Sequence, residues 1–232
     1  MINEADYKKL TEHYHDMVEL FDVVHLNSSI TEGVYKNNLN IKNSKIVSIT
    51  NSHIKDNRRL RHYNSDILNL LFVGNSTIYK GLPILKEVLM ELSDEGVNNW
   101  KLDIWGDMKK RGECDNIRYN GKFAPSELPK LFKDDTLLIT PSFWMETFSL
   151  ITLEALSYGV PTLVSANVGA KDVVGEYDKW FIYISKKDLK SKLRELIADR
   201  SKLVEFNKRI LENEWTHCME NHCNDILSLY NL

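Results

Sequence analysis

The segment from residue 135 to residue 165 constrains the fold more than any other part of the chain, because its apolar positions change period in a defined order. Residues 136–140 form a short apolar run that ends at a proline, which predicts a buried strand. Helical spacing begins near Ser149 and ends at Gly159, a residue suited to closing a helix. Residues 162–165 return to a strand pattern. This order predicts one unit of a parallel α/β sheet.

Two carboxylates accompany this helix, Glu146 in the preceding loop and Glu154 eight residues later. A helix amino terminus presents unpaired amides and the positive end of its dipole, so the amides of residues 148–150 would suit a phosphate. The carboxylate inside the helix could accept hydrogen bonds from a ribose diol, and the loop carboxylate could reach a group beyond the phosphates. The set suits a nucleoside diphosphate that carries a polyhydroxylated group. The alternative is an ordinary helix with one dipole-favoured glutamate and one solvated glutamate.

The remainder of residues 66–232 alternates strands with helices, which predicts a parallel sheet with helices on both faces. We expect strands at 68–73, 101–105, 116–119, 136–140, 162–165 and 180–184, and helices at 82–92, 126–132, 149–158, 169–174, 187–198, 201–211 and 215–230.

Residues 1–65 have a shorter pattern and are expected to form a separate small α/β part. The amphipathic pattern of residues 1–20 predicts a helix. We expect strands at 21–26 and 45–50 with a helix at 28–35 between them. Residues 51–65 are polar and basic without periodicity, and they are expected to be a linker.

Two loops that follow strands are expected to line one crevice, since ligands of open α/β sheets bind at the carboxyl ends of the strands. These loops are residues 74–80 and 142–149. Their convergence would add the Lys80 ammonium to the phosphate site at the helix end. No Walker motif is present, and no G-x-G-x-x-G follows the first strand.

Composition excludes several classes of function. A net charge of −3 gives no reason to expect nucleic-acid binding. The three cysteines do not have the spacing of a disulfide framework. Cys218 and His222 lie one helical turn apart and could ligate zinc, but further ligands are not evident, so we expect no metal. No apolar run is long enough to span a membrane, and we expect a cytoplasmic protein that binds a membrane at most peripherally, at its inner face.

Four stretches taken together carry a family resemblance. They are LLFVGNSTIYKGLPIL, KLDIWGD, NIRYNGKFAPSELPKLF and LLITPSFWMETFSLITLEALSYGVPTLVS. In this order they resemble the carboxyl-terminal, Rossmann-like half of a GT-B glycosyltransferase of the retaining type called group 1 or family 4. The family's Glu-x7-Glu motif matches Glu146 and Glu154, its Lys-Gly matches Lys80 and Gly81, and a further glycine matches Gly169.

The resemblance implies transfer of a sugar from a nucleoside diphosphate sugar, with retention at the anomeric carbon and without a metal or cofactor. It gives Lys80 to the pyrophosphate, Glu154 to the ribose and the catalytic role near the transferred sugar to Glu146. The acceptor would be a saccharide or a lipid-linked molecule in polysaccharide or glycoconjugate biosynthesis. The implied donor-binding residues are Gly74, Asn75, Lys80, Thr147, Phe148, Ser149, Leu150 and Glu154.

The chain departs from this family pattern at several positions, among them Met108 and Ala170, where the family has glycine, and two further departures bear on function. Asn75 stands where the family often has an arginine, so one expected cation of the phosphate site is missing. Residues 1–65 resemble only the last part of an acceptor-side domain, so residues 66–232 form the donor domain and the rest would come from a longer enzyme or a partner subunit. Two alternatives stay open, a non-catalytic nucleotide-sugar-binding subunit and a nucleotide-sugar epimerase of the same fold.

Overall fold

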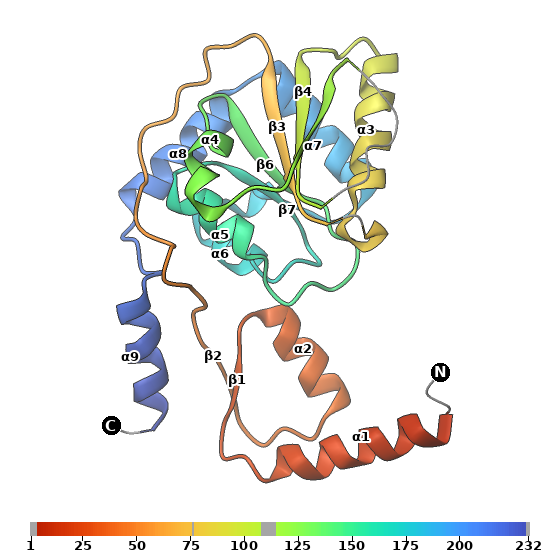
Figure 1. Ribbon diagram of the computed structural model, residues 1–232, viewed down its shortest axis with the longest axis vertical. Helices are drawn as coiled ribbons and strands as arrows, with labels where there is room; N and C mark the ends of the chain where they lie inside the picture. The colour runs from red at the N-terminus through yellow and green to blue at the C-terminus, as the bar shows by residue number, and fades with distance from the viewer. Residues whose placement is uncertain (1–3, 76, 108–114, 231–232) are drawn as a thin grey trace.

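The computed structural model describes residues 4–75, 77–107 and 115–230. Its main body is a six-stranded parallel sheet in the order β5-β4-β3-β6-β7-β8 (Figure 1). The chain enters the sheet at its centre, runs outward to β5 and returns to β6 on the other side, so the strand order reverses between β3 and β6. The strands are β3 (Leu68–Val73), β4 (Trp100–Trp105), β5 (Ile117–Gly121), β6 (Thr136–Thr140), β7 (Thr162–Ser165) and β8 (Ile182–Tyr183).

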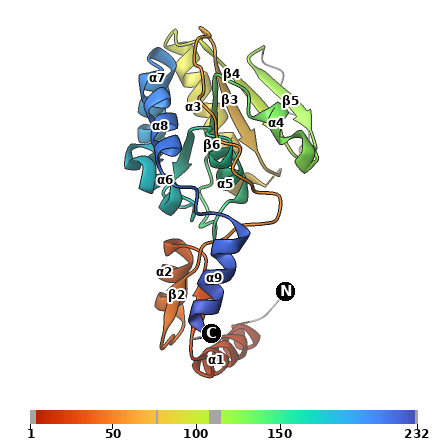
Figure 2. The same ribbon diagram turned by 90° about the vertical axis from the view of Figure 1, so that its left-hand side faces the viewer.

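Helices cover both faces of this sheet (Figures 1 and 2). They are α3 (Leu82–Asp94), α4 (Leu128–Leu131), α5 (Leu150–Ser157), α6 (Lys171–Asp178), α7 (Lys186–Ala198) and α8 (Ser201–Glu212). Alternate residues of β3 feed two apolar cores, because successive side chains of a strand point to opposite faces. Leu70 and Phe72 enter the larger core with α3, α6, α7 and α8, whereas Leu71 enters the smaller core with α4. The predicted α/β class is therefore confirmed.

The predicted boundaries of three strands are confirmed, since β3, β6 and β7 begin and end at the expected residues. Three boundary errors reach four residues. Helix α6 ends four residues later than predicted, and the strand predicted at residues 45–50 ends four residues earlier. The last helix, α9 (Met219–Leu229), begins four residues later than predicted. Trp215 lies in an extended segment instead, where its ring packs 5.3 Å from the His217 ring. The His217 carbonyl accepts a hydrogen bond from Thr50 Oγ1 (3.0 Å), so contacts with the amino-terminal part hold this segment extended.

The amino-terminal part contains a parallel two-stranded sheet and two helices. These elements are α1 (Glu4–Glu19), β1 (Val24–Leu26), α2 (Ser29–Asn38) and β2 (Ser44–Ile46), and both strands are shorter than predicted. Figure 2 shows α9 returning from the main body to lie beside this sheet. Ser48 Oγ donates to Asp225 Oδ2 of α9 (2.6 Å), and His222 Nδ1 lies 2.5 Å from the Ser48 carbonyl oxygen. The last helix is thus spatially part of the amino-terminal unit.

Residues 51–65 contain no helix or strand, as expected of a linker, but two of their basic side chains, Arg58 and Arg61, are not freely solvated. Arg61 is 2% exposed, and its guanidinium donates to the carbonyls of Phe132 (2.6 Å) and Tyr158 (2.5 Å). Burial lowers the pKa of Arg61 to about 10. Arg58 donates to the carbonyls of Ile210 and Asn213. The segment is therefore held against the main body at defined points, which its composition did not predict.

Candidate functional site

The two loops expected to converge do meet at the carboxyl ends of β3 and β6. The Phe143 amide donates to the Tyr79 carbonyl (3.2 Å). Gly81, with φ +76°, packs so closely that a Cβ there would lie 1.8 Å from the Pro141 carbonyl oxygen. Only glycine allows this approach, because it has no Cβ and accepts a positive φ. The glycine after Lys80 thus fixes the distance between the two loops.

Lys80 and Glu146 form the charged centre of the site. Lys80 Nζ donates to Glu146 Oε1 (2.5 Å), and Ser142 Oγ donates to Glu146 Oε2 (2.6 Å). The Lys80 side chain is 33% exposed and that of Glu146 is 17% exposed, so the pair faces solvent from a partly enclosed position. The Glu146 backbone is fixed as well, since its amide donates to Asn167 and its carbonyl accepts from Gly169. A phosphate arriving here would compete with Glu146 for the ammonium.

The amino terminus of α5 lies directly after this pair. The amides of Phe148, Ser149 and Leu150 donate to no acceptor within the described residues, so they are available to an anion. The Phe148 side chain is buried in the larger core, so only its backbone could serve a ligand. Ser149 was expected to begin the helix, but it precedes the helix with φ +113° and ψ +88°, a conformation that L residues rarely adopt. Its hydroxyl accepts a hydrogen bond from Thr152 Oγ1 (3.2 Å).

Glu154, one turn into α5, has a partner that the sequence did not indicate. His53 Nε2 lies 2.7 Å from Glu154 Oε1, and the Glu154 side chain is 13% exposed. Burial raises the pKa of Glu154, while the hydrogen bond with His53 acts in the opposite direction. His53 was missed because residues 51–65 carry no periodicity, so only the folded path of the linker reveals this contact.

The other predicted residues contribute no charged side chain to the site, but they determine its shape. A Cβ at Gly106 would lie 1.7 Å from the Gly74 carbonyl oxygen, so β3 and β4 are in close contact where they end. Asn75 Oδ1 accepts hydrogen bonds from the Thr77 amide (3.2 Å) and hydroxyl (2.6 Å), which turns its side chain back on its own loop. The Thr147 carbonyl accepts from Ser28 Oγ (2.6 Å) and thereby ties the site loop to α2.

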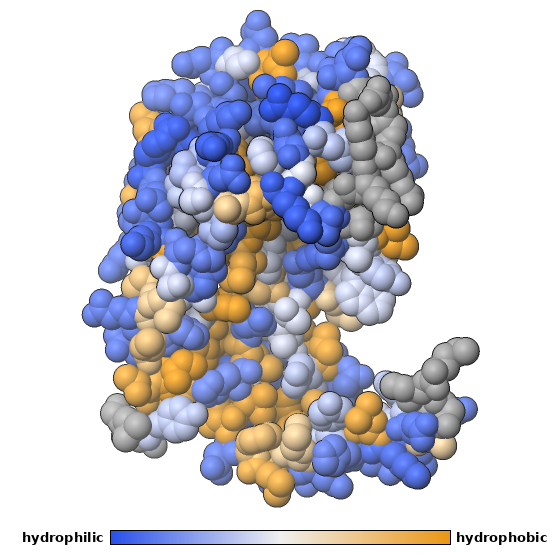
Figure 3. All heavy atoms as spheres, viewed as in Figure 1, coloured by the Kyte–Doolittle hydropathy of each residue, from blue (hydrophilic) through white to orange (hydrophobic). Residues whose placement is uncertain are grey.

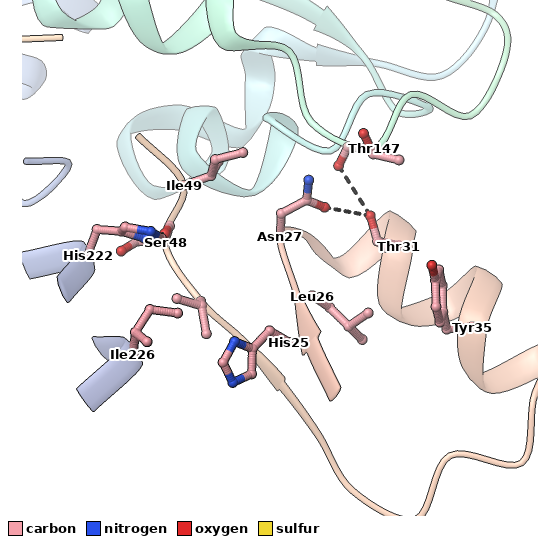
Figure 4. A pocket seen from close by; sticks show the side chains of 11 residues that line it. His25, Leu26, Asn27, Thr31, Tyr35, Ser48, Ile49, Thr147, His222 and Ile226 are labelled. Atoms are coloured by element: carbon pink, nitrogen blue, oxygen red, sulfur yellow. Dashed lines mark hydrogen bonds between the residues drawn. The ribbon is translucent and has the colours of Figure 1, made fainter. Parts of the chain in front are cut away.

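A cavity of about 450 Å³ lies away from the charged centre, between β1, β2, α2 and α9 (Figure 4). Of the predicted site residues, only Thr147 reaches it. The remaining lining side chains come from the amino-terminal part and α9, and they are His25, Leu26, Asn27, Thr31, Tyr35, Val47, Ser48, Ile49, His222 and Ile226. Figure 3 shows apolar side chains gathered over this lower region of the molecule.

The described residues bring no three His, Cys, Asp or Glu side chains together in a group that could hold a metal ion. His222, one member of the pair considered for zinc, contacts the Ser48 carbonyl. Cys114 lies outside the described residues. Within the described ranges, no helix is both long and apolar enough to cross a membrane.

Comparison with known proteins agrees with this geometry. The profile of the family "Glycosyl transferases group 1" matches residues 55–213, which include Lys80, Glu146 and Glu154. The chain belongs to the glycosyl transferases group 1. His53 lies just outside the matched span of this family.

Two relatives in sequence and one solved structure show how far the likeness extends. An O-antigen chain mannosyltransferase B of Escherichia coli is 33% identical over 99 residues, or 42% of this chain and 26% of the relative. A 41.2 kDa protein in the cps region of Klebsiella pneumoniae is 32% identical over 113 residues, or 47% of this chain and 30% of the relative. The crystal structure of Anabaena HepE with UDP and glucose has a TM-score of 0.75 at 14% identity, and the likeness covers all of this chain and 70% of HepE.

Proposed function

We propose that this chain supplies the donor-binding half of a retaining glycosyltransferase. The enzyme would transfer a sugar from a nucleoside diphosphate sugar to a saccharide or lipid-linked acceptor in polysaccharide or glycoconjugate biosynthesis. The observation that carries the proposal is the Lys80–Glu146 pair, which lies directly before the free amides of α5. A cation and free amides next to a carboxylate match a pyrophosphate that carries a sugar.

Each part of the donor has a chemical partner in this arrangement. The pyrophosphate would receive the Lys80 ammonium and the amides of residues 148–150, which balance the charge of the leaving diphosphate without a metal. The ribose diol would donate to Glu154, whose carboxylate is held by His53. Glu146, once released from Lys80, would face the sugar and stabilise positive charge at the anomeric carbon. Ser142 would keep that carboxylate oriented through its second oxygen.

Two similar proteins support this assignment. Escherichia coli mannosyltransferase B acts on an O-antigen chain, which is a polysaccharide. Anabaena HepE, whose fold is similar, was crystallised with UDP and glucose. The matched segments cover less than a third of the length of either bacterial relative. The activity of the whole enzyme is therefore a proposal for this chain.

A second candidate is a nucleotide-sugar-binding subunit that is inactive without a partner. The feature that favours it is the parallel two-stranded sheet of β1 and β2, next to the open cavity, whose exposed surface is mostly apolar. Parallel sheets are usually covered on both faces, so this surface would accommodate the rest of an acceptor-side domain, in the same polypeptide or as a partner. We propose that the enzyme acts at the cytoplasmic face of the membrane, to which it would be attached peripherally at most.

The direct test is thermal unfolding of the chain with UDP, GDP or ADP at increasing concentration. Binding to the native state raises the unfolding temperature with the logarithm of the ligand concentration above its dissociation constant. We expect a shift with at least one diphosphate, and none with the corresponding nucleoside. Absence of any shift at millimolar concentrations of all three would contradict the donor site.

A further inference from the structure

Three exposed aromatic side chains form a cluster on the two site loops. Tyr79, Phe143 and Trp144 are 50%, 43% and 62% exposed, respectively. The Tyr79 ring lies 5.8 Å from the Phe143 ring and 5.4 Å from the Trp144 ring, at interplanar angles of 54° and 55°. Rings tilted in this way leave parts of their faces open to solvent. We call these three residues the aromatic cluster.

The backbone holds the aromatic cluster in place although its side chains are exposed. The Phe143 amide donates to the Tyr79 carbonyl (3.2 Å), which joins the two loops. Asn167 Nδ2 donates to the Phe143 carbonyl (2.8 Å), which joins the second loop to the segment after β7. The cluster is therefore a pre-formed surface, and ordering it on binding would cost little conformational entropy.

The aromatic cluster continues directly from the charged centre of the site. Tyr79 precedes Lys80 in the chain, and Trp144 lies two residues before Glu146. The donor sugar would lie at Glu146, and the hydroxyl that receives it must approach within bonding distance of the anomeric carbon. A molecule bound over the aromatic cluster would therefore occupy the place from which an acceptor reaches the donor.

We propose that the aromatic cluster binds a sugar ring of the acceptor saccharide, with Tyr79 and Trp144 as the main contacts. This proposal rests on the function proposed above. One face of a pyranose ring is formed largely by C–H groups, which pack against aromatic rings, while its hydroxyls stay at the edge and reach water or polar groups. Aromatic side chains suit such a ligand because they offer large, rigid contact areas.

Charge favours a saccharide over an anionic membrane at this surface. The loop sequence from Pro141 to Leu150 contains no Arg or Lys, and Lys80 of the other loop is paired with Glu146. Attachment to anionic lipids depends on basic side chains near the apolar contact. A neutral ring needs none. Among the described residues of the two site loops, Lys80 is the one basic side chain and it is paired with Glu146, which matches a saccharide.

The test is saturation-transfer NMR of this chain with three neutral probes, α-mannobiose, maltose and lactose, in the presence of UDP or whichever diphosphate binds. We expect saturation transfer to the C–H protons of at least one probe, reduced at least fivefold by Trp144→Ala and by Tyr79→Ala. Trp144→Phe keeps a ring and should retain more of the effect than Trp144→Ala. Tyr7→Ala is the matched control, since Tyr7 is a tyrosine on α1 that is more exposed (66%) than Tyr79 (50%).

The outcomes separate this proposal from the donor site. Nucleoside diphosphate affinity should stay within twofold of wild type in Trp144→Ala and Tyr79→Ala, and circular dichroism should be unchanged. Retained diphosphate binding without Trp144-dependent transfer to any probe would overturn the acceptor surface alone. Trp144-dependent cosedimentation with phosphatidylglycerol vesicles, without saccharide contact, would overturn it in favour of a membrane surface. If the unmutated chain binds no nucleoside diphosphate, the proposed function itself is contradicted.

Discussion

Glu154 on α5 and His53 in the linker are joined by a hydrogen bond of 2.7 Å between Oε1 and Nε2. The linker therefore takes part in the site, although it was expected only to connect two parts of the chain. Ile54, which follows His53, is 4% exposed and belongs to the larger core, so the histidine is held next to the carboxylate by the packing of its neighbour. One oxygen of Glu154 remains for a ribose diol.

The first prediction follows from the opposing effects on the pKa of Glu154. Burial raises this pKa and His53 lowers it, so His53→Ala should raise it further. A protonated carboxyl is a poorer acceptor for a diol. The loss of nucleoside diphosphate affinity caused by His53→Ala should therefore be larger at pH 5 than at pH 7.5. Calorimetric titration at both values of pH measures this difference. His53→Gln keeps an N–H donor and should show a smaller dependence, whereas parallel pH profiles for all three proteins would exclude the effect.

Lys80 carries the second prediction. The Asn75 side chain turns back on its own loop, so Lys80 is the one cationic side chain among the described residues of the two site loops. Lys80→Ala should weaken nucleoside diphosphate binding by roughly 1.5–3 kcal/mol, the range for a hydrogen bond to a charged group. Lys8→Ala removes an exposed lysine on α1 and should change nothing. Equal affinity of Lys80→Ala and wild type, measured by calorimetry, would remove Lys80 from the site.

The third prediction separates the two carboxylates. Glu154→Ala should weaken binding of the bare nucleoside diphosphate, because it removes the acceptor for the ribose. Glu146→Ala should leave that binding unchanged or make it tighter, since the Lys80 ammonium loses its internal partner. Only the sugar-bearing donor should lose affinity in Glu146→Ala. Titrations of both variants with UDP and UDP-glucose, or the matching pair for another base, test this, and the hypothesis fails if the two variants behave alike.

The sequence predicted those parts of the site that depend on local pattern. Strands β3 and β6 were located by their apolar runs, and the rule for parallel sheets then brought Lys80 and Glu146 into one crevice, where they form an ion pair. Glu154 was placed one turn into the helix by counting alone. These inferences succeeded because strand period and helix rise are fixed by the backbone.

The parts that were missed depend on long-range packing. His53 reaches Glu154 because Arg58 and Arg61 bind carbonyls of the main body and fix the path of the linker. A polar, basic stretch gives no indication of such a path. The positive φ of Ser149 was also missed, since serine, unlike glycine, does not mark an unusual backbone conformation in the sequence.

This backbone conformation of Ser149 leads to the fourth prediction. An L residue at φ +113° is strained, and such strain costs of order 1–3 kcal/mol. Ser149→Gly relieves it but loses the hydrogen bond from Thr152 and increases the freedom of the unfolded chain, so we expect a net gain of about 1 kcal/mol in the free energy of unfolding. Urea unfolding measures the change. Ser157→Gly, at the last residue of α5, relieves no positive φ and loses the hydrogen bond from its hydroxyl to the Glu154 carbonyl, so it should instead destabilise the protein by about 1 kcal/mol.

The last prediction concerns what the chain does by itself. The residues assigned to the donor lie on the loops at the carboxyl edge of one sheet and on α5, and the two cores that support them are buried within the same body. We therefore expect the isolated chain to bind a nucleoside diphosphate at micromolar to millimolar dissociation constants, or roughly −4 to −8 kcal/mol. Affinity in this range fits a site that is enclosed on one side only.

Transfer needs more than this binding, because most of its rate comes from holding donor and acceptor in a closed, dry cleft. The surface opposite the donor residues is built from the two short strands β1 and β2, whose neighbouring cavity is open and apolar. A sugar cation forming there would meet water before it met an acceptor hydroxyl. We predict slow donor hydrolysis at most, and no acceptor-dependent product, in a radiolabelled transfer assay with a purified saccharide. Adding an acceptor-side half, in the same polypeptide or as a separate chain, should restore transfer, whereas robust transfer by this chain alone would show that β1, β2 and the aromatic cluster already build a complete acceptor site.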